Sequence, residues 1–440
     1  MSHSAHPVDQ VPPKAQLLAF GLQHVLAMYA GAVAVPLIVG GALHMSTSDI
    51  GYLVNADLLV SGVATLIQCL GVWVFGARLP LMQGCTFAAV TPMVLIGTTG
   101  GGLPAIYGAV IVSGLVVVLL APWFAKLLRY FPPLVTGTII LIIGLSLLPV
   151  AVNWAAGGVG APSFGSPRNL ALAFGVLLLI LLVQRFVPGF LGRIAILVGV
   201  VLGTLAAIPL GLTDFSHVTS AQLIGVSTPF HFGLPSFQPA AILSMVIVML
   251  VTMTETSGDV LAVGEVVGRP VEPPVLARAL RADGLSTVLG GVFNTFPYTA
   301  FAQNVGLVAL TGVRSRFVVA TAGGMLVLLG LFPVLGEVVA AIPMPVLGGA
   351  GIAMFGTVAA SGVRMLGAVS FRDNSNLMVI AVALGLGLVP VAVPTVYAQF
   401  PDWFQTIMNS GISAGSIAAV ALNLLFNPVR AITPQGAGNS

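Results

Sequence analysis

The apolar residues of this chain come in runs of about twenty, and the gaps between the runs are short. A helix of about that length spans the hydrocarbon core of a bilayer. Only 6% of the 440 residues are charged, whereas a soluble domain carries roughly 25%. We therefore predict an all-α protein that crosses a membrane many times.

We predict fourteen membrane segments, of which the third and the tenth are too short or too broken to be plain spanning helices. The segments are 16–41, 50–73, 80–97, 104–123, 131–151, 168–186, 191–211, 239–264, 279–295, 297–311, 316–338, 342–363, 376–394 and 410–427.

The positive charges give an independent test of this segment count, because the cytoplasmic loops of membrane proteins carry most of the Lys and Arg residues. With the N-terminus inside and fourteen alternating segments, fourteen of the fifteen Lys and Arg residues fall inside. Only Arg168 falls outside. One missed segment would scatter every later charge. We therefore predict a multi-pass protein of the cytoplasmic (inner) membrane with both termini in the cytoplasm.

The two halves of the chain resemble each other. Segment 133–144 matches segment 345–356 in its Pro and Gly positions, and the two broken segments open at Pro80 and Pro297. Because each half holds seven segments, the second half enters the membrane from the opposite side. Such an inverted repeat is common in secondary transporters, which bind their substrate near the bilayer midplane. Chance recurrence of Gly and Pro is the alternative explanation.

Charged side chains inside apolar segments are costly, so the few that remain need a reason. Glu255 and Asp259 lie four residues apart in the eighth segment, which places them on one helix face. Two buried carboxylates this close resist ionising together. The pair is suited to accept a proton, to bind a hydrogen-bond donor or to hold a cation. Neutralisation by helix-end amides or by an arginine is the structural alternative.

Three further ionisable residues lie in apolar segments. His24 in the first segment and Asp283 in the ninth fit either a structural hydrogen bond or a proton network. We interpret Asp57 in the second segment as structural, with a local partner.

The broken segments are candidates for a binding site. Residues 297–301 favour an extended strand, a half-helix follows over 305–311, and the repeat partner of this region is 83–88. Backbone N–H groups at such a break must be paired or must face a polar cavity. Two breaks that meet would combine backbone donors, an aromatic face and the amides of Gln303 and Asn304. Packing between helices is the structural alternative for those two amides.

Several other chemistries find no support in the sequence. It contains no phosphate-binding P-loop, no His/Cys cluster with metal-ligand spacing and no nucleophile elbow. We therefore expect neither an enzyme nor an ATP-driven pump, no cofactor and no metal, and we find no sign of a nucleic-acid partner.

At these residues the sequence resembles the nucleobase–ascorbate transporter family, also called nucleobase:cation symporter family 2. The family signature is Gln, Glu or Pro, then Asn, any residue, Gly, four residues and Thr. In this chain it reads Gln303-Asn304-Val-Gly306-Leu-Val-Ala-Leu-Thr311. The Gln-His pair of the first segment and the acidic residues of the eighth and ninth segments are present as Gln23, His24, Glu255, Asp259 and Asp283. The resemblance covers residues 14–428.

The resemblance implies a 7+7 inverted repeat with short strands in segments 3 and 10. A core domain would comprise 14–123 and 239–338, and a gate domain 131–211 and 342–427, with cytoplasmic tails at 1–13 and 428–440. The site would lie between the two strands, and the core would move against the gate by alternating access. The resemblance also implies a homodimer through the gate domains.

The resemblance further implies roles for individual residues. Glu255 would accept paired N–H groups of a base, and Gln303 would bind another edge. Backbone N–H groups at Phe87 and Ala302 would meet carbonyls, while Phe87 and Phe301 would flank the ring. The residues expected to line the site are Glu255, Gln303, Phe87, Phe301, Ala302 and Gly31. Those expected to support the site or the proton path are His24, Asp259, Asp283, Asn304 and Thr86.

The residue at 303 bears on the substrate, because purine-type relatives have Gln there and uracil-type relatives have Glu. Residues 294–313 and 52–62 also resemble the corresponding stretches of bacterial xanthine and uric acid permeases. We therefore predict import of xanthine or uric acid with protons, with sodium as the alternative coupling ion. Rival hypotheses are a uracil-type symporter, a channel, and a sulfate-like anion transporter of the same fold. Glu255 beside Asp259 argues against the last, since an anion site prefers donors and cations.

Overall fold

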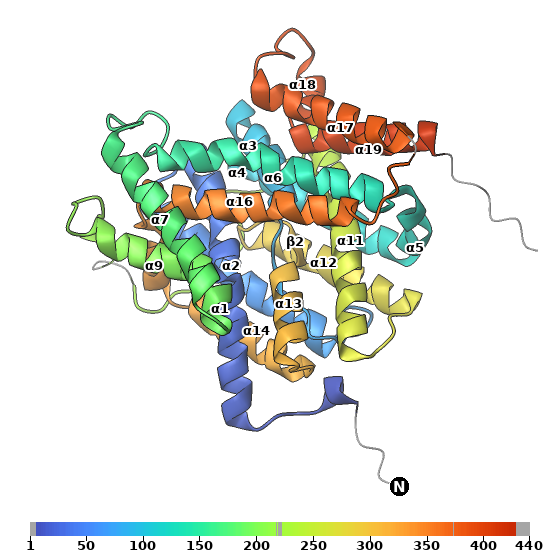
Figure 1. Ribbon diagram of the computed structural model, residues 1–440, viewed down its shortest axis with the longest axis horizontal. Helices are drawn as coiled ribbons and strands as arrows, with labels where there is room; N and C mark the ends of the chain where they lie inside the picture. The colour runs from blue at the N-terminus through green and yellow to red at the C-terminus, as the bar shows by residue number, and fades with distance from the viewer. Residues whose placement is uncertain (1–5, 217, 219–221, 373, 428–440) are drawn as a thin grey trace, which may run out of the picture.

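The structure is a computed structural model that describes residues 6–216, 218, 222–372 and 374–427. Within this part of the chain, eight helices are long and apolar enough to cross a membrane. Counting each of two bent helix pairs as one span raises the number to ten. The prediction of a helical protein with many membrane helices is thus confirmed (Figure 1).

The elements follow one another in a regular order along the chain. The first half contains α1 (Lys14–Ala42), α2 (Thr47–Leu70), β1 (Gln83–Cys85), α3 (Val90–Ile96), α4 (Gly102–Leu120), α5 (Phe124–Leu127), α6 (Pro133–Ala155), α7 (Pro167–Phe186), α8 (Phe190–Arg193) and α9 (Ala195–Ala207). The second half contains α11 (Pro239–Val267), α12 (Pro273–Val292), β2 (Tyr298–Ala300), α13 (Ala302–Thr311), α14 (Arg316–Gly330), α15 (Pro333–Ala340), α16 (Met344–Leu366), α17 (Asn374–Ala392), α18 (Asp402–Met408) and α19 (Gly411–Phe426).

Local sequence explains where many of these helices begin. Ser46 and Ser166 cap α2 and α7, because each side-chain oxygen accepts a hydrogen bond from a backbone N–H of the first turn. Proline occupies the first turn of α6, α11, α12 and α16, where its missing N–H leaves no hydrogen bond unmade.

Two short strands from opposite halves of the chain meet inside the helical bundle. β1 pairs antiparallel with β2, with Gln83 opposite Ala300, Gly84 opposite Thr299 and Cys85 opposite Tyr298. The strands predicted in the two broken segments are therefore confirmed. The half-helix after β2 begins at Ala302, three residues earlier than predicted.

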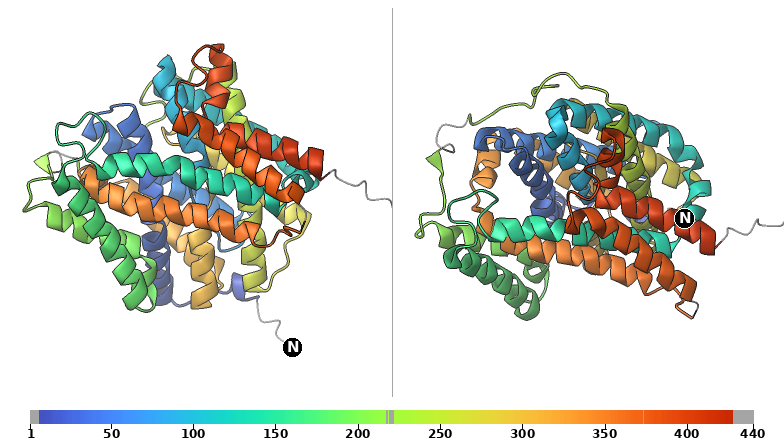
Figure 2. Two further views of the ribbon diagram at one scale, coloured as in Figure 1. Left: turned by 45° about the horizontal axis from the view of Figure 1, so that its top comes forward. Right: turned by 90° about the horizontal axis from the view of Figure 1, so that it is seen from above.

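The helices pack in two groups. α2, α4, α12 and α14 pack against one another around the strands, with α1 and α11 alongside. In the second group α6 and α16 run side by side and pack against α7 and α19 (Figures 1 and 2). The close approach of α6 and α16 requires Gly144, because a Cβ atom there would lie 2.4 Å from the backbone nitrogen of Ala359.

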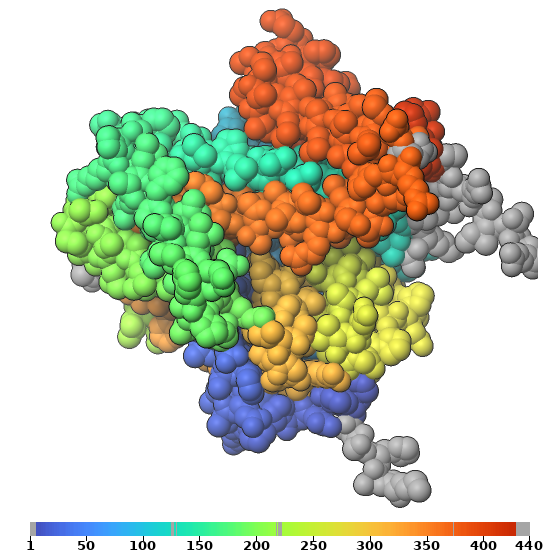
Figure 3. Space-filling model, in the orientation of Figure 1, coloured from blue at the N-terminus to red at the C-terminus, as the bar shows by residue number. Residues whose placement is uncertain are grey.

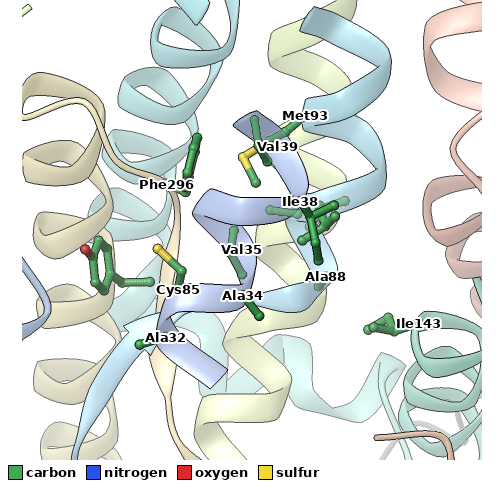
Figure 4. Packing of buried hydrophobic residues seen from close by; sticks show 14 of the residues in the cluster. Ala32, Ala34, Val35, Ile38, Val39, Cys85, Ala88, Met93, Ile143 and Phe296 are labelled. Carbon is green, nitrogen blue, oxygen red and sulfur yellow. The ribbon is translucent and has the colours of Figure 1, made fainter. Parts of the chain in front are cut away.

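Apolar side chains fill the space around the strand crossing. Figure 4 shows Val35 and Ile38 of α1 near Cys85 of β1, Phe296 and Met93. All five side chains are buried. The strand pair is therefore enclosed by packed helices on this side.

The structure corrects two predicted segments. Segment 316–338 is two helices, α14 and α15, whose axes differ by 83°. Pro333 begins α15 and lacks the N–H needed to continue α14. Segment 191–211 is likewise divided into α8 and α9. α18 was not predicted, and it meets α19 at 78°.

The predicted tail 1–13 is partly a docked segment. Residues 7–9 form a single turn of 3-10 helix, and Val8 is fully buried. Asp9 forms ion pairs with Arg269 at 3.2 Å and with Arg316 at 2.8 Å. The segment therefore joins the C-terminal end of α11 to the N-terminal end of α14. The predicted tail 428–440 lies outside the described residues.

Candidate functional site

Hydroxyl groups of three helices fix the strand pair in place. Thr65 on α2, Thr287 on α12 and Thr256 on α11 accept hydrogen bonds from the backbone N–H groups of Gln83, Tyr298 and Ala300, at 3.0, 3.1 and 3.3 Å. A strand pair buried among apolar helices has no water to satisfy its outer N–H groups. The threonines therefore set the depth and the tilt of both strands.

Asp57 joins the two strands through their side chains. Its Oδ1 accepts hydrogen bonds from the Tyr298 hydroxyl at 2.8 Å, the Cys85 thiol at 2.8 Å and the Thr295 hydroxyl at 3.2 Å. The structural interpretation of Asp57 fits this geometry, but its partners at 295 and 298 lie far along the chain. Sequence reasoning therefore missed Asp57 as a residue that positions the site.

The ring of Phe301 lies between two glycines. A Cβ atom on Gly31 of α1 would lie 2.9 Å from its Cε1, and one on Gly84 of β1 would lie 2.0 Å from its Cε2. Phe301 is only 5% exposed. Gly31 thus provides room for this ring, and Phe301 fixes the start of α13 against α1 and β1.

The N-terminal end of α13 faces an open side of the molecule. Ala302 and Gln303 are exposed, and a Cβ atom on Gly306 would contact nothing within 4 Å. A Cβ atom on Gly258 of α11 would likewise contact nothing within 4 Å. Glu255, one helical turn before Gly258, is half-buried. Figure 3 shows α13 at the surface between α7 and α11, with α16 passing above.

The structure brings three predicted acidic residues together. Asp259 lies close enough to Glu255 and Asp283 for both to repel its charge. Gln68 donates a hydrogen bond to Oδ1 of Asp283 at 3.3 Å. Oδ2 of Asp283 and Oδ2 of Asp259 are buried, and neither has a hydrogen-bond partner among the described residues. A buried carboxylate oxygen without a donor is unstable as a charge, so this cluster is suited to take up and release protons.

No described cation neutralises the cluster. Glu255 forms neither an ion pair nor a hydrogen bond with the described part of the chain. In the same described residues there is no group of three His, Cys, Asp or Glu side chains that could hold a metal ion. The carboxylate of Glu255 is therefore free to receive donors from a ligand.

His24 and Asn304 form a buried pair between α1 and α13. The amide Nδ2 of Asn304 lies 3.0 Å from Nδ1 of His24 and donates to the His24 carbonyl at 2.9 Å. Since the amide nitrogen of Asn304 is a donor, Nδ1 of His24 acts as the acceptor. The ring proton of the neutral imidazole is therefore on Nε2. This pair holds α13 against α1 and gives both residues a positioning role, whereas the neighbouring Gln303 points outward.

Phe87 connects the strand region to α16. Thr86 follows β1, accepts a hydrogen bond from the N–H of Ala88 at 3.2 Å and donates its own N–H to the Pro297 carbonyl at 2.9 Å. The half-buried Phe87 ring meets Phe355 of α16 edge to face, with centroids 5.7 Å apart. The contact couples the position of α16 to the residues that follow β1.

The Permease family matches residues 15–396. The chain belongs to this permease family. A xanthine permease of Bacillus subtilis (strain 168) is 45% identical over 410 residues, which cover 93% of each chain. A uric acid transporter of Escherichia coli (strain K12) is 44% identical over 423 residues, covering 96% of this chain and 88% of the other. The resemblance to nucleobase–ascorbate transporters is confirmed, and the protein is a permease rather than an enzyme.

Solved structures of transporters with low sequence identity share the fold of this permease. The transmembrane domain of the cyanobacterial bicarbonate transporter BicA matches with a TM-score of 0.58 at 15% identity, covering 94% of this chain and 98% of that one. SLC26A9 matches with a TM-score of 0.60 at 13% identity, covering 94% of this chain and 66% of that one. At these identities the likeness concerns the fold alone.

Replacement of Asp57 tests the strand-joining role. We expect Asp57→Ala to lower the apparent melting temperature of the purified permease by several degrees, because each buried donor left without an acceptor costs about 1–3 kcal/mol. Asp57→Asn keeps an acceptor oxygen and should have a smaller effect. Asp402→Ala, at the exposed start of α18, is the control. Equal apparent melting temperatures for Asp57→Ala and Asp402→Ala would contradict the proposed role of Asp57 in joining the two strands.

Proposed function

We propose that this permease imports an oxidised purine, xanthine or uric acid, by alternating access. The observation that carries the proposal is Glu255, a half-buried carboxylate without a cationic partner in the described chain, beside open space at Gly258. The names of the similar xanthine and uric acid transporters support the same substrate class.

The residues around Glu255 suit the hydrogen-bonding pattern of an oxidised purine. Adjacent ring N–H groups donate to the two oxygens of a carboxylate in a bidentate manner. The Ala302 N–H is the first of α13 and therefore has no acceptor within its helix. The positive end of that helix favours a ligand carbonyl oxygen. Gln303 supplies both a donor and an acceptor, and Phe87 supplies an apolar edge.

We propose protons as the coupling ion, with sodium as the alternative. Glu255, Asp259 and Asp283 repel one another and share no described cation. Protonation of this cluster removes net charge, which lowers the cost of moving it through the membrane interior. Substrate donors that bind Glu255 and protons that bind its neighbours would then favour the same movement.

We also propose fourteen spans in an inverted 7+7 repeat, with a core domain of 14–123 and 239–338 and a gate domain of 131–211 and 342–427. The equal lengths of corresponding helices support this: α1 and α11 each have 29 residues, and α6 and α16 each have 23. The order of elements around β1 and β2 and the two packing groups of helices support it as well.

An anion transporter is the second candidate, because BicA carries bicarbonate on a related fold. The strand pair and the first turn of α13 would offer an anion the same backbone donors. The carboxylate of Glu255 beside these donors disfavours it, since an acceptor-only group repels an anion.

Glu255→Gln tests the proposed substrate site. The change keeps the size of the side chain and removes its charge, so we expect xanthine uptake to fall about ten- to one-hundred-fold. The measurement is uptake of radiolabelled xanthine by cells that express each variant, with urate, uracil and sulfate as competitors. Asp402→Asn removes a carboxylate from an exposed helix and should leave uptake unchanged. Concentrative uptake by Glu255→Gln at the wild-type level would refute the site.

Competition and coupling separate the rivals in the same assay. Inhibition by urate but not by sulfate or uracil supports the purine assignment. A protonophore should abolish accumulation in sodium-free medium. Accumulation that requires sodium would show that sodium, and not the proton, is the coupling ion. Flux that only follows the xanthine gradient would favour a channel.

Cysteine labelling tests the proposed topology. Cys69 and Cys85 are both buried, so a cysteine introduced at an exposed site dominates the labelling. We expect Phe164→Cys, between α6 and α7, to react with an impermeant maleimide in intact cells. Arg314→Cys, between α13 and α14, should react only after the cells are permeabilised. Reaction of both from the same side would disprove the segment count.

We propose a homodimer through the gate domains. The membrane windows of α7 and α17 are only 22% buried, against 56–67% for the other six long helices. Their exposed apolar faces fit lipid or a second copy equally. Light scattering with correction for bound detergent should give twice the mass of one chain, which is 44.9 kDa. The mass of a single chain would exclude the dimer.

A further inference from the structure

A polar cavity lies away from the Glu255 cluster. It has a volume of about 410 Å³ and opens among the first half of α2, segment 222–231 and the junction of α14 with α15. None of the three clustered carboxylates lines it. In the proposed topology this cavity lies on the outer side of the membrane.

Two buried oxygens in this cavity have no donor. Glu337 on α15 is 8% exposed and Asn55 on α2 is 5% exposed. Oε2 of Glu337 and Oδ1 of Asn55 find no hydrogen-bond partner among the described residues. The amide nitrogen of Asn55 donates to the Pro333 carbonyl at 3.1 Å, which fixes the orientation of the amide and leaves Oδ1 as the free atom. Buried acceptors of this kind need a donor from elsewhere.

A flat aromatic surface lines the same cavity. The rings of Tyr52 and His231 stack with centroids 4.1 Å apart and planes 17° apart. The hydroxyl of Tyr52 accepts a hydrogen bond from the Thr228 N–H at 2.7 Å, which holds the ring in place. Such a surface complements a planar ring.

The charge of the cavity defines the ligand further. Its lining includes Asp49 and Glu337 but neither Lys nor Arg among the described residues. Asp49 is already bonded to the Ser46 hydroxyl at 2.7 Å. A ligand must therefore bring donors rather than negative charge.

We propose that this cavity is a second binding site for a planar heteroaromatic molecule that carries N–H donors. The choice of a purine as its ligand rests on the proposed function. The N–H groups would bind Glu337 and Asn55, and the ring would lie against Tyr52 or His231.

The position of the site predicts an effect on transport. Segment 222–231 belongs to the connection from α9 to α11, and α15 to the connection from α14 to α16. Figure 2 shows the first of these running along the outside of the molecule. Both connections join the proposed core to the proposed gate, and Gly225 N–H donates to the Leu331 carbonyl between them at 3.0 Å. A ligand held between α2 of the proposed core and segment 222–231 would restrain this connection and so resist movement of one domain against the other.

Equilibrium dialysis of the purified full-length protein with radiolabelled xanthine tests the second site. At saturation we expect two equivalents bound by the wild type, one by Glu337→Gln and one by Glu255→Gln. Asp402→Asn, which removes a carboxylate from an exposed helix, should bind two. His231→Ala alters an exposed side chain and should weaken the outer site about three- to tenfold through loss of stacking. It replaces Glu337→Gln if that variant fails to fold.

The possible outcomes separate this proposal from the proposed function. One equivalent in the wild type, lost in Glu255→Gln and unaffected by both outer variants, would overturn the second site and leave the proposed function intact. Binding of no xanthine by a folded wild type, together with no uptake, would overturn both.

Discussion

The hydrogen bonds between β1 and β2 are the constraint on which the rest of the permease depends. A broken helix at membrane depth exposes backbone groups that lipid cannot satisfy. Each strand here satisfies the other, and the threonines on α2, α11 and α12 satisfy the outer groups. Asp57 then joins the side chains of the two strands. The first N–H groups of α13, directly after β2, have no acceptor within their own helix.

The same frame explains how polar groups can serve transport within an apolar protein. Phe301 lies between Gly31 and Gly84 and His24 is bonded to Asn304, so the start of α13 is held on two sides. Glu255 on α11 has no counter-charge among the described residues. A free carboxylate suits a ligand that carries N–H donors and repels a simple anion. Phe87 meets Phe355 of α16 edge to face, which is one contact between the two helix groups.

Much of this arrangement could be predicted from the sequence, and the failures have physical causes. Long apolar runs predicted the many membrane helices. Pro297, Tyr298, Thr299 and Phe301 predicted the strand in the tenth segment, and the internal repeat placed its partner at 83–88. The acids at 255, 259 and 283 stood out because charge is rare in lipid. The bend at Pro333 was missed because α15 is as apolar as the helix before it. The role of Asp57 was missed because its partners are distant in sequence, and no local pattern records a long-range hydrogen bond. The outer cavity was missed for the same reason, since it combines three remote segments.

The pairing of β1 with β2 also has a consequence for how the chain is made. Gly84 lies opposite Thr299, so β1 enters the membrane more than two hundred residues before its partner exists. At ribosomal rates of about 5–20 residues per second, that delay is roughly ten to forty seconds. During this time the N–H and C=O groups of β1 need temporary hydrogen-bond partners, which the insertion machinery or water must supply. The first half therefore cannot complete this strand pair by itself, and a chain truncated before β2 leaves the pairing edge of β1 without its partner.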